Sequence, residues 1–236
     1  MIDSHVHLGR LHQGGKLWGD FQDYKKICRK LGIKNYCVTP IGESENFKNR
    51  KTPDNDSVLV ECEKDRKIIP VYWFNIFELP DSIDERYKAI KFHPDIGEIN
   101  LNDSLITNFV YRINLPIFVH TNESKDFSDL GKAANLAKKV NVPVIAVHSG
   151  SVTRTFFRLD DYVFPDNLYF ETSGIQYALI LQKIYKRFGA DRIIFGSDYP
   201  FGDPRVSLAM IETLELRKRE YENITEKNIK RILALQ

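Results

Sequence analysis

The stretch "MIDSHVHLGR" at residues 1–10 places His5 and His7, two of only six histidines in the chain, in a short apolar segment. Similar segments, rich in Val, Ile, Phe and Tyr, recur along the chain between longer charged stretches. They lie at residues 34–40, 68–77, 89–94, 116–121, 143–150, 167–174 and 192–200. Short β-branched or aromatic segments of this kind are typical of buried parallel strands. The sequence therefore predicts eight such strands.

The stretches between these segments have the spacing of helices. Residues 20–32 place Phe21, Tyr24 and Cys28 on one helical face, and Gly32 ends that helix. Residues 129–141 and 206–221 follow the same pattern. Eight strands, each followed by a helix, predict a (β/α)8 TIM barrel. An open doubly wound sheet is the alternative, but no GxGxxG follows the first strand.

Composition sets the broad class of protein. The 236 residues are 42% hydrophobic and 28% charged with a net charge of +2, as in ordinary globular proteins. We expect one domain over 1–236, because no linker or composition break divides the chain. The near-neutral charge gives no reason to expect nucleic-acid or membrane partners. Three cysteines without a CxxC pair, no leader-like segment and no long apolar run favour a cytoplasmic location.

Two polar stretches have ordinary interpretations. Residues 41–57 form the longest polar stretch and are expected in the loop after the second strand. The charged residues 215–231 are expected to form a solvated helical surface rather than a binding patch.

Most of the histidines fall at one end of the predicted barrel. His5, His7, His93, His120 and His148 end predicted strands, whereas His12 falls in a glycine-containing loop. The carboxyl ends of barrel strands are where active sites form. Two imidazoles at alternate strand positions point to the same side and can bind one metal ion. Asp198, at the end of the last strand, adds a carboxylate from the adjacent wall.

Each of these residues alone has an ordinary structural explanation. His-x-His can be a polar strand end, His120 a core histidine, and Asp198 a turn residue before Pro200. Asp3 either supports a ligand or only begins the strand. Histidines with unrelated structural roles, however, would not be expected to gather at the same end of several strands. The combination therefore favours a metal site.

Six segments together resemble a known family. In order they are "IDSHVHLG", "IKFHP", "FVHT", "AVHSG", "YFETSG" and "IIFGSDYP", and they span nearly the whole chain. They resemble the amidohydrolase superfamily, in particular its branch with aminocarboxymuconate-semialdehyde decarboxylase and related small metal-dependent hydrolases. This resemblance implies a (β/α)8 barrel, a divalent metal at its mouth, and hydrolytic or decarboxylating chemistry.

The resemblance also implies roles for individual residues. His5, His7, His120 and Asp198 would hold a single metal, and His148 would orient or deprotonate a water activated by it. Asp198 could share that proton handling. Three imidazoles and a carboxylate suit Zn²⁺, although Mn²⁺, Fe²⁺ or Co²⁺ fit the same ligands.

Lys91 departs from part of the superfamily. Binuclear members use a carboxylated lysine or a glutamate at this strand end to bridge two metals. The "K-x-H-P" pattern of residues 91–94 instead favours Lys91 as a cation for a substrate anion. If Lys91 were carboxylated, a second metal would bind and His148 would be its ligand.

The candidate substrate-binding residues are charged or aromatic: Arg10, Trp18, Lys91, His93 and Tyr199, with Phe201, Glu171, Ser173 and Arg154 also near the predicted mouth. Surface charge and ordinary packing are the alternatives for several of them. Glu171 points into the mouth or toward the helices, depending on strand register.

The leading hypothesis is a metal-dependent hydrolase that cleaves an amide, lactone or ester bond of a small, anionic substrate. A non-oxidative decarboxylase of an unsaturated or aromatic acid is the alternative within enzymes. A catalytically silent metal-binding barrel is the alternative from another class, and the complete set of ligand residues disfavours it. A homodimer is the default expectation for assembly.

Overall fold

The computed structural model describes residues 1–13, 16–41, 51–122, 127–150 and 159–235. For residues 10–13 and 16–18 it describes the backbone alone. Eight strands form one sheet in the order β1-β4-β5-β6-β7-β8-β9-β10, and each neighbouring pair is parallel. The strands are β1 (Ile2–Leu8), β4 (Asn35–Pro40), β5 (Ile68–Trp73), β6 (Ala89–Phe92), β7 (Ile117–His120), β8 (Val144–Val147), β9 (Leu168–Glu171) and β10 (Ile193–Ile194).

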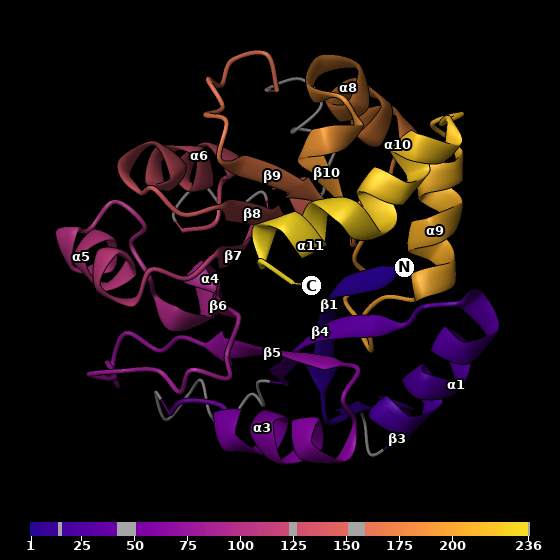
Figure 1. Ribbon diagram of the computed structural model, residues 1–236. Coiled ribbons are helices and arrows are strands. Elements are labelled where there is room, and N and C mark those ends of the chain that lie inside the picture. Colours follow the sequence, from indigo (N-terminus) through magenta and orange to yellow (C-terminus); the bar gives the residue numbers. More distant parts are fainter. Residues whose placement is uncertain (14–15, 42–50, 123–126, 151–158, 236) are drawn as a thin grey trace.

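The sheet closes on itself next to β1 (Figure 1). The Ser4 amide donates to the Phe195 carbonyl at 3.0 Å, and the His7 amide donates to the Tyr199 carbonyl at 2.8 Å. Only Ile193 and Ile194 form regular β10, so the last strand is shorter than predicted. The residues after it follow β1 through these single bonds. The predicted TIM barrel is confirmed.

Helices surround the strands (Figure 1). They are α1 (Phe21–Leu31), α3 (Asn55–Lys64), α4 (Pro94–Gly97), α5 (Ser104–Ile113), α6 (Leu130–Lys139), α8 (Ala178–Phe188), α9 (Pro204–Glu212), α10 (Lys218–Glu222) and α11 (Asn228–Ile232). Short helical turns are η1 (His148–Gly150), η2 (Ala190–Arg192) and the π-helical η3 (Asn223–Lys227). Helix α1 begins where the Asp20 side chain accepts from the amides of Gln22 and Asp23, and it ends at Gly32 with φ 74°. Among the described residues, no helix is both long and apolar enough to cross a bilayer.

Three sequence-based expectations for these elements were wrong. Residues 74–88, all described, contain no helix, so β5 leads to β6 through irregular chain. The single helix expected over 206–221 is two, because Glu215 has a left-handed φ of 50° that an α-helix cannot contain. Strands β2 (Arg10–Gln13) and β3 (Lys16–Asp20) form an antiparallel hairpin where a loop around His12 was expected. In the predicted loop 41–57, residues 42–50 lie outside the described residues.

Side chains along each strand alternate between the outside and the inside of the barrel. Outward side chains such as Val6, Val119 and Phe170 pack against the helices. Inward side chains near the amino ends are apolar, among them Cys37, Ile69 and Phe118. This lower layer gives the barrel a packed floor.

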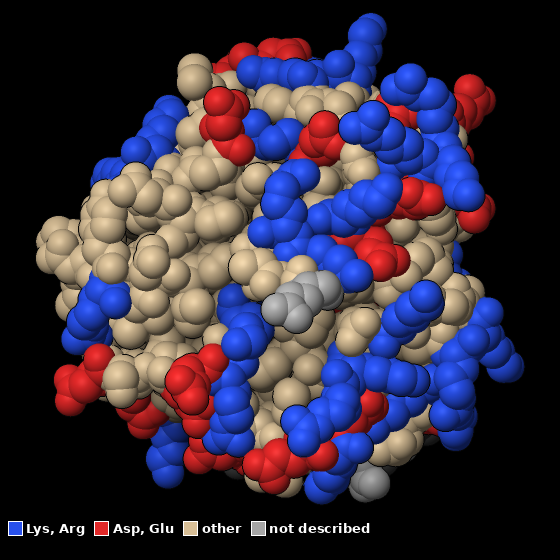
Figure 2. All heavy atoms as spheres, in the orientation of Figure 1, with Lys and Arg blue, Asp and Glu red and all other residues tan. Residues whose placement is uncertain are grey.

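Helix α11 covers that floor from outside with Ile229 and Ile232. The stretch 215–231, expected as a solvated helical surface, is therefore buried in part: Ile224 and Ile229 are fully buried, and Ile229 packs against the floor of the barrel. The outer side carries mixed charges (Figure 2), including the ion pairs Lys227–Glu222 and Lys230–Glu226.

Candidate metal centre

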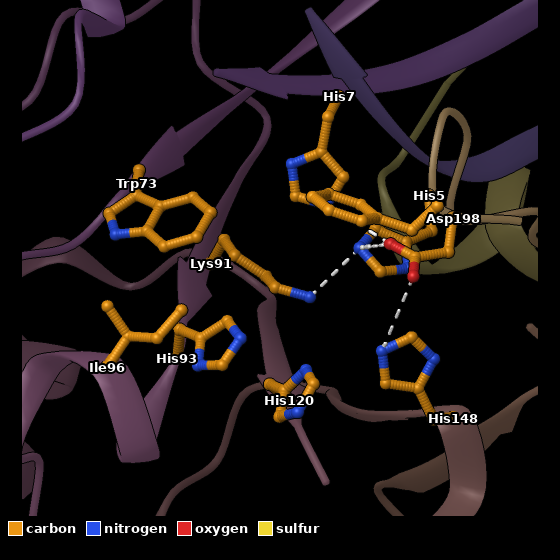
Figure 3. Close-up of a pocket in the computed structure, with 10 residues that line it drawn as sticks. His5, His7, Trp73, Lys91, His93, Ile96, His120, His148 and Asp198 are labelled. Carbon is orange, nitrogen blue, oxygen red and sulfur yellow. Dashed lines mark hydrogen bonds and ion pairs between the residues drawn. The ribbon is translucent and has the colours of Figure 1, made fainter. Parts of the chain in front are cut away.

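Three imidazoles meet one carboxylate at the carboxyl end of the barrel (Figure 3). Asp198 Oδ1 lies 3.3 Å from His5 Nε2 and 3.2 Å from His7 Nε2. Asp198 Oδ2 lies 3.9 Å from His148 Nε2. The donor atoms of His5, His148 and Asp198 all lie within 4.8 Å of one another. Residues far apart in sequence thus form one cluster.

Backbone geometry aims these side chains. Strand β1 places His5 and His7 on one face, and both are nearly fully buried. His148 and Asp198 have left-handed φ values of 65° and 59°. Such angles are uncommon outside glycine and tend to occur at functional sites. A bond from the Asp198 amide to the His5 carbonyl, 2.8 Å long, holds the Asp198 backbone against β1.

Hydrogen bonds fix which imidazole nitrogen carries the proton. His7 Nδ1 lies 3.1 Å from the Pro40 carbonyl oxygen, and His148 Nδ1 lies 3.2 Å from the Ser173 carbonyl oxygen. A carbonyl only accepts, so each Nδ1 donates its proton, and in the neutral ring each Nε2 keeps a lone pair. Lys91 Nζ, which only donates, lies 3.0 Å from His5 Nε2. His5 Nε2 is therefore an acceptor as well.

This donor set fits a divalent cation. The Nε2 atoms of His5 and His7 lie little more than 3 Å from the same carboxylate oxygen. When the rings are neutral, this arrangement repels unless positive charge lies between the atoms. Neutral imidazole nitrogens with a carboxylate are ligands typical of catalytic zinc and related ions. Burial lowers the pKa of His5 well below its usual range and that of His148 to about 4, which keeps both rings neutral.

His120 lies in the same pocket but outside this cluster. Its ring stacks on His93, with centroids 3.8 Å apart and planes 16° apart. It meets the His148 ring edge-on at 4.8 Å. Within the described part of the chain, the ion pairs of Asp198 are those with His5, His7 and His148, and none joins it to His120. Burial lowers the pKa of His120 far below its usual range.

Two further charged side chains are buried beside the cluster. Burial lowers the pKa of Lys91 to about 8, whereas Asp198 and Glu171 act in the opposite direction. Burial raises the pKa of Glu171 to about 7. The register of β9 turns Glu171 into the barrel rather than toward the helices, because its oxygens bond Ser173 and the His148 amide. Both charges are thus part of the site.

Asp3 lies fully buried beneath the cluster. Its Oδ1 accepts from the amides of His5 at 3.2 Å and Ser197 at 2.9 Å, and its Oδ2 accepts from the Tyr24 hydroxyl at 2.8 Å. Asp3 therefore ties β1 to the segment just before Asp198. Of the two interpretations of this residue from sequence, support of the ligands matches these contacts better than simply beginning the strand.

The cluster opens into a small pocket of about 270 Å³. Its described lining is His5, His7, Trp73, Lys91, His93, Ile96, His120, His148, Asp198 and Phe201. Trp73 and Ile96 were missed from the sequence. The position of Trp73 at the carboxyl end of β5 was a usable signal, whereas Ile96 on α4 gave none. A small pocket that combines these polar side chains with the apolar Trp73, Ile96 and Phe201 suits a small organic molecule with a charged group.

The other residues predicted to bind substrate do not share one position. Tyr199 does not line this pocket, and its ring centroid lies 5.0 Å from that of Tyr24. Arg10 and Trp18 belong to β2 and β3, but their side chains are outside what the structure describes. Arg154 lies outside the described residues. Lys91 and His93 both line the pocket.

Comparison with known proteins identifies the family. Residues 78–235, more than half of the chain, match the family model described as amidohydrolase. The chain belongs to the amidohydrolase family, as its sequence motifs predicted. It is therefore an enzyme of a metal-dependent family of hydrolases and decarboxylases, to which the cluster of histidines and Asp198 conforms. A search of curated proteins found no match.

Solved structures share the barrel at low sequence identity. An amidohydrolase from Burkholderia multivorans with bound zinc has a TM-score of 0.73 and 14% identity, covering 100% of this chain and 99% of the other. A 2,6-dihydroxybenzoate decarboxylase from Rhizobium gives 0.71 and 14%, covering 99% and 98%. A putative 2-pyrone-4,6-dicarboxylic acid hydrolase from Pseudomonas putida gives 0.72 and 13%, covering 99% and 97%.

Proposed function

We propose that this enzyme uses one divalent metal, Zn²⁺, to hydrolyse an amide, lactone or ester bond of a small carboxylated compound. The observation that carries the proposal is the convergence of imidazole nitrogens on the Asp198 carboxylate, beside a buried lysine, in a pocket of about 270 Å³. We assign His5, His7, His120 and Asp198 as the ligands. His120 is included because it ends β7 in the same pocket, next to His148.

The chain's own groups then have distinct tasks. When bound, the metal supplies a Lewis acid that activates water and polarises the bond to be cleaved. His148 Nε2 has a free lone pair near Asp198, so it takes the proton from the attacking water and returns it to the leaving group. Its two bonds at Nδ1 to Ser173 keep the ring in that orientation.

Lys91 is assigned to a carboxylate of the substrate. It is the one cationic side chain among the described residues lining the pocket, and it lies between apolar walls that include Trp73 and Phe201. One lone pair on His5 cannot hold two cations, so a His5 that binds metal leaves the Lys91 ammonium available. The carboxylates of Asp198 and Glu171 favour an ammonium here over a negatively charged carbamate.

Decarboxylation is the second candidate. The observation that favours it is the aromatic wall formed by Trp73 and the stacked His93, with ring centroids 5.7 Å apart, which suits a planar acid. The Rhizobium enzyme with the same fold acts on 2,6-dihydroxybenzoate. In this reaction the bond between the substrate carbon and its carboxylate would break and release CO2. His148 Nε2 would take up a proton from solvent and pass it to the carbon left behind.

A substrate panel tests the proposed function. Protein loaded with Zn²⁺ is incubated with small carboxylated lactones, amides and esters, and separately with unsaturated and aromatic acids. We expect hydrolysis of at least one member of the first group, lost on chelation and restored by Zn²⁺. Release of CO2 without incorporation of labelled oxygen from water would replace hydrolysis by decarboxylation. Activity that survives complete metal removal would contradict both.

Lys91→Met should raise KM for the carboxylated substrate by about 10- to 100-fold, since a charge-assisted hydrogen bond contributes roughly 1.5–3 kcal/mol. Its zinc content should match that of the wild type. Steady-state kinetics and elemental analysis measure the two quantities. Two metal ions per chain in the wild type and fewer in Lys91→Met would instead identify Lys91 as a carboxylated bridging ligand.

Domain organisation, cellular location and assembly are also proposed. We propose that residues 1–236 act as one barrel domain, in the cytoplasm, as a homodimer. Support for the cytoplasm comes from the cysteines Cys28, Cys37 and Cys62, none of which forms a disulfide.

A further inference from the structure

A buried hydroxyl and a buried carboxylate lie behind the imidazoles. Ser173 Oγ lies 2.9 Å from His148 Nδ1, 3.3 Å from His5 Nδ1 and 2.6 Å from Glu171 Oε2. Neither Ser173 nor Glu171 is exposed to solvent. One hydroxyl thus touches two rings on the side opposite their Nε2 atoms.

The direction of these hydrogen bonds follows from groups that can act in only one way. Glu171 Oε2 accepts from the His148 amide at 3.0 Å, and Oε1 accepts from the Ser173 amide at 2.6 Å. These amides can only donate, so they hold the Glu171 side chain as an acceptor. The Ser173 hydroxyl donates its single proton to Glu171 Oε2 at 2.6 Å. Its lone pairs remain to accept from the Nδ1 protons of the rings.

Contacts at the other ends of the chain agree with this direction. Lys91 Nζ donates to His5 Nε2 at 3.0 Å, which places the His5 proton on Nδ1, facing Ser173. His148 Nδ1 also faces the Ser173 carbonyl at 3.2 Å. The hydrogen bonds run without a reversal from the Lys91 ammonium through His5 and Ser173 to Glu171.

Two glycines make room for the arrangement. A Cβ on Gly196 would lie 2.2 Å from Glu171 Oε1, and a Cβ on Gly174 would lie 2.9 Å from His148 Nδ1. Gly174 also has a φ of 68°, which side chains other than glycine rarely adopt. The space around this carboxylate and hydroxyl therefore depends on residues without side chains.

We propose that Glu171 and Ser173 are positioning residues that jointly hold His5 and His148 in the Nδ1-protonated form, with both unprotonated Nε2 atoms on the side of Asp198. A second layer that orients metal-binding histidines in this way typically changes metal affinity or activity 10- to 100-fold when removed. The consequence for metal affinity rests on the proposed function, whereas the protonation pattern does not.

Ser173→Ala tests the proposal, with Ser149→Ala as a matched control. Ser149 is equally buried and its hydroxyl bonds the Glu171 carbonyl at 2.8 Å, but it touches neither ring. Zn²⁺ affinity is measured by competition with a chelator. We expect a loss of about 10- to 100-fold for Ser173→Ala and an affinity near that of the wild type for Ser149→Ala. Equal losses in the two variants would overturn the proposal.

The protonation pattern is read in metal-free protein by proton–nitrogen correlation spectra of the imidazoles, assigned with His5→Gln and His148→Gln. In the wild type both rings should be protonated on Nδ1. In Ser173→Ala the His5 Nδ1 proton should lose its protected signal, whereas His148 keeps its own through the carbonyl of residue 173. A wild-type His5 protonated on Nε2, or a variant with both signals unchanged, would overturn the proposal. Absence of Zn²⁺ binding by the wild type would refute the proposed function while leaving this pattern measurable.

Discussion

Replacing His5 and His7 together by alanine should abolish metal binding and activity. The two rings supply two of the three nitrogens that face Asp198, from alternate positions of β1. Removing both leaves the carboxylate with His148 as its nearest imidazole. Elemental analysis of the purified variant should find no stoichiometric metal, and assays should find no turnover.

Loss of two buried side chains also destabilises the barrel, so the variant needs a folded control. His5→Gln combined with His7→Gln keeps polar side chains of similar size and should lose metal to the same extent. Circular dichroism and thermal melting establish that each variant is folded. Zinc that is undiminished in a folded double variant would refute the assigned site.

Asp198→Asn should have the second largest effect. The amide nearly matches the carboxylate in size, but it is a poor ligand and cannot take up a proton. It would also leave Lys91 without one of the two carboxylates that raise its pKa. We expect Zn²⁺ affinity to fall by more than the roughly 100-fold that loss of a supporting residue costs, and activity to fall with it.

Asp203→Asn is the matched control for this substitution. Asp203 lies in the same loop region, but its side chain caps α9 and pairs with Arg205 instead of lining the pocket. Asparagine is an equally good helix cap, so the control should keep both metal and activity. If Asp198→Asn retained full metal content, Asp198 would not be a ligand.

Much of the site was readable because strand geometry is local and periodic. Alternate residues of a strand point to the same side, so His5 and His7 had to share a face. Parallel strands end together at one rim, so His93, His120 and His148 had to lie near each other. Both deductions need only the strand assignment, and the ordered motifs then identified the family.

Other features depended on chain segments with no such period. The irregular connection from β5 to β6 and the break between α9 and α10 follow from backbone angles such as that of Glu215, which composition does not reveal. The burial of α11 depends on the shape of the barrel floor that it covers. At these places the helical spacing of apolar residues gave wrong predictions.

The sequence by itself thus determined the barrel, the family and the rim at which the histidines gather, since each of these follows from local alternation and order along the chain. Only the tertiary structure decided that His148 faces Asp198 while His120 stacks on His93. It also decided that the Pro40 carbonyl and the Ser173–Glu171 pair set the protonation of the rings. The physical reason is that closure of the sheet brings together hydrogen-bond partners from opposite sides of the barrel. In addition, every residue has a main-chain carbonyl, so the amino-acid sequence does not show which carbonyl will accept a hydrogen bond.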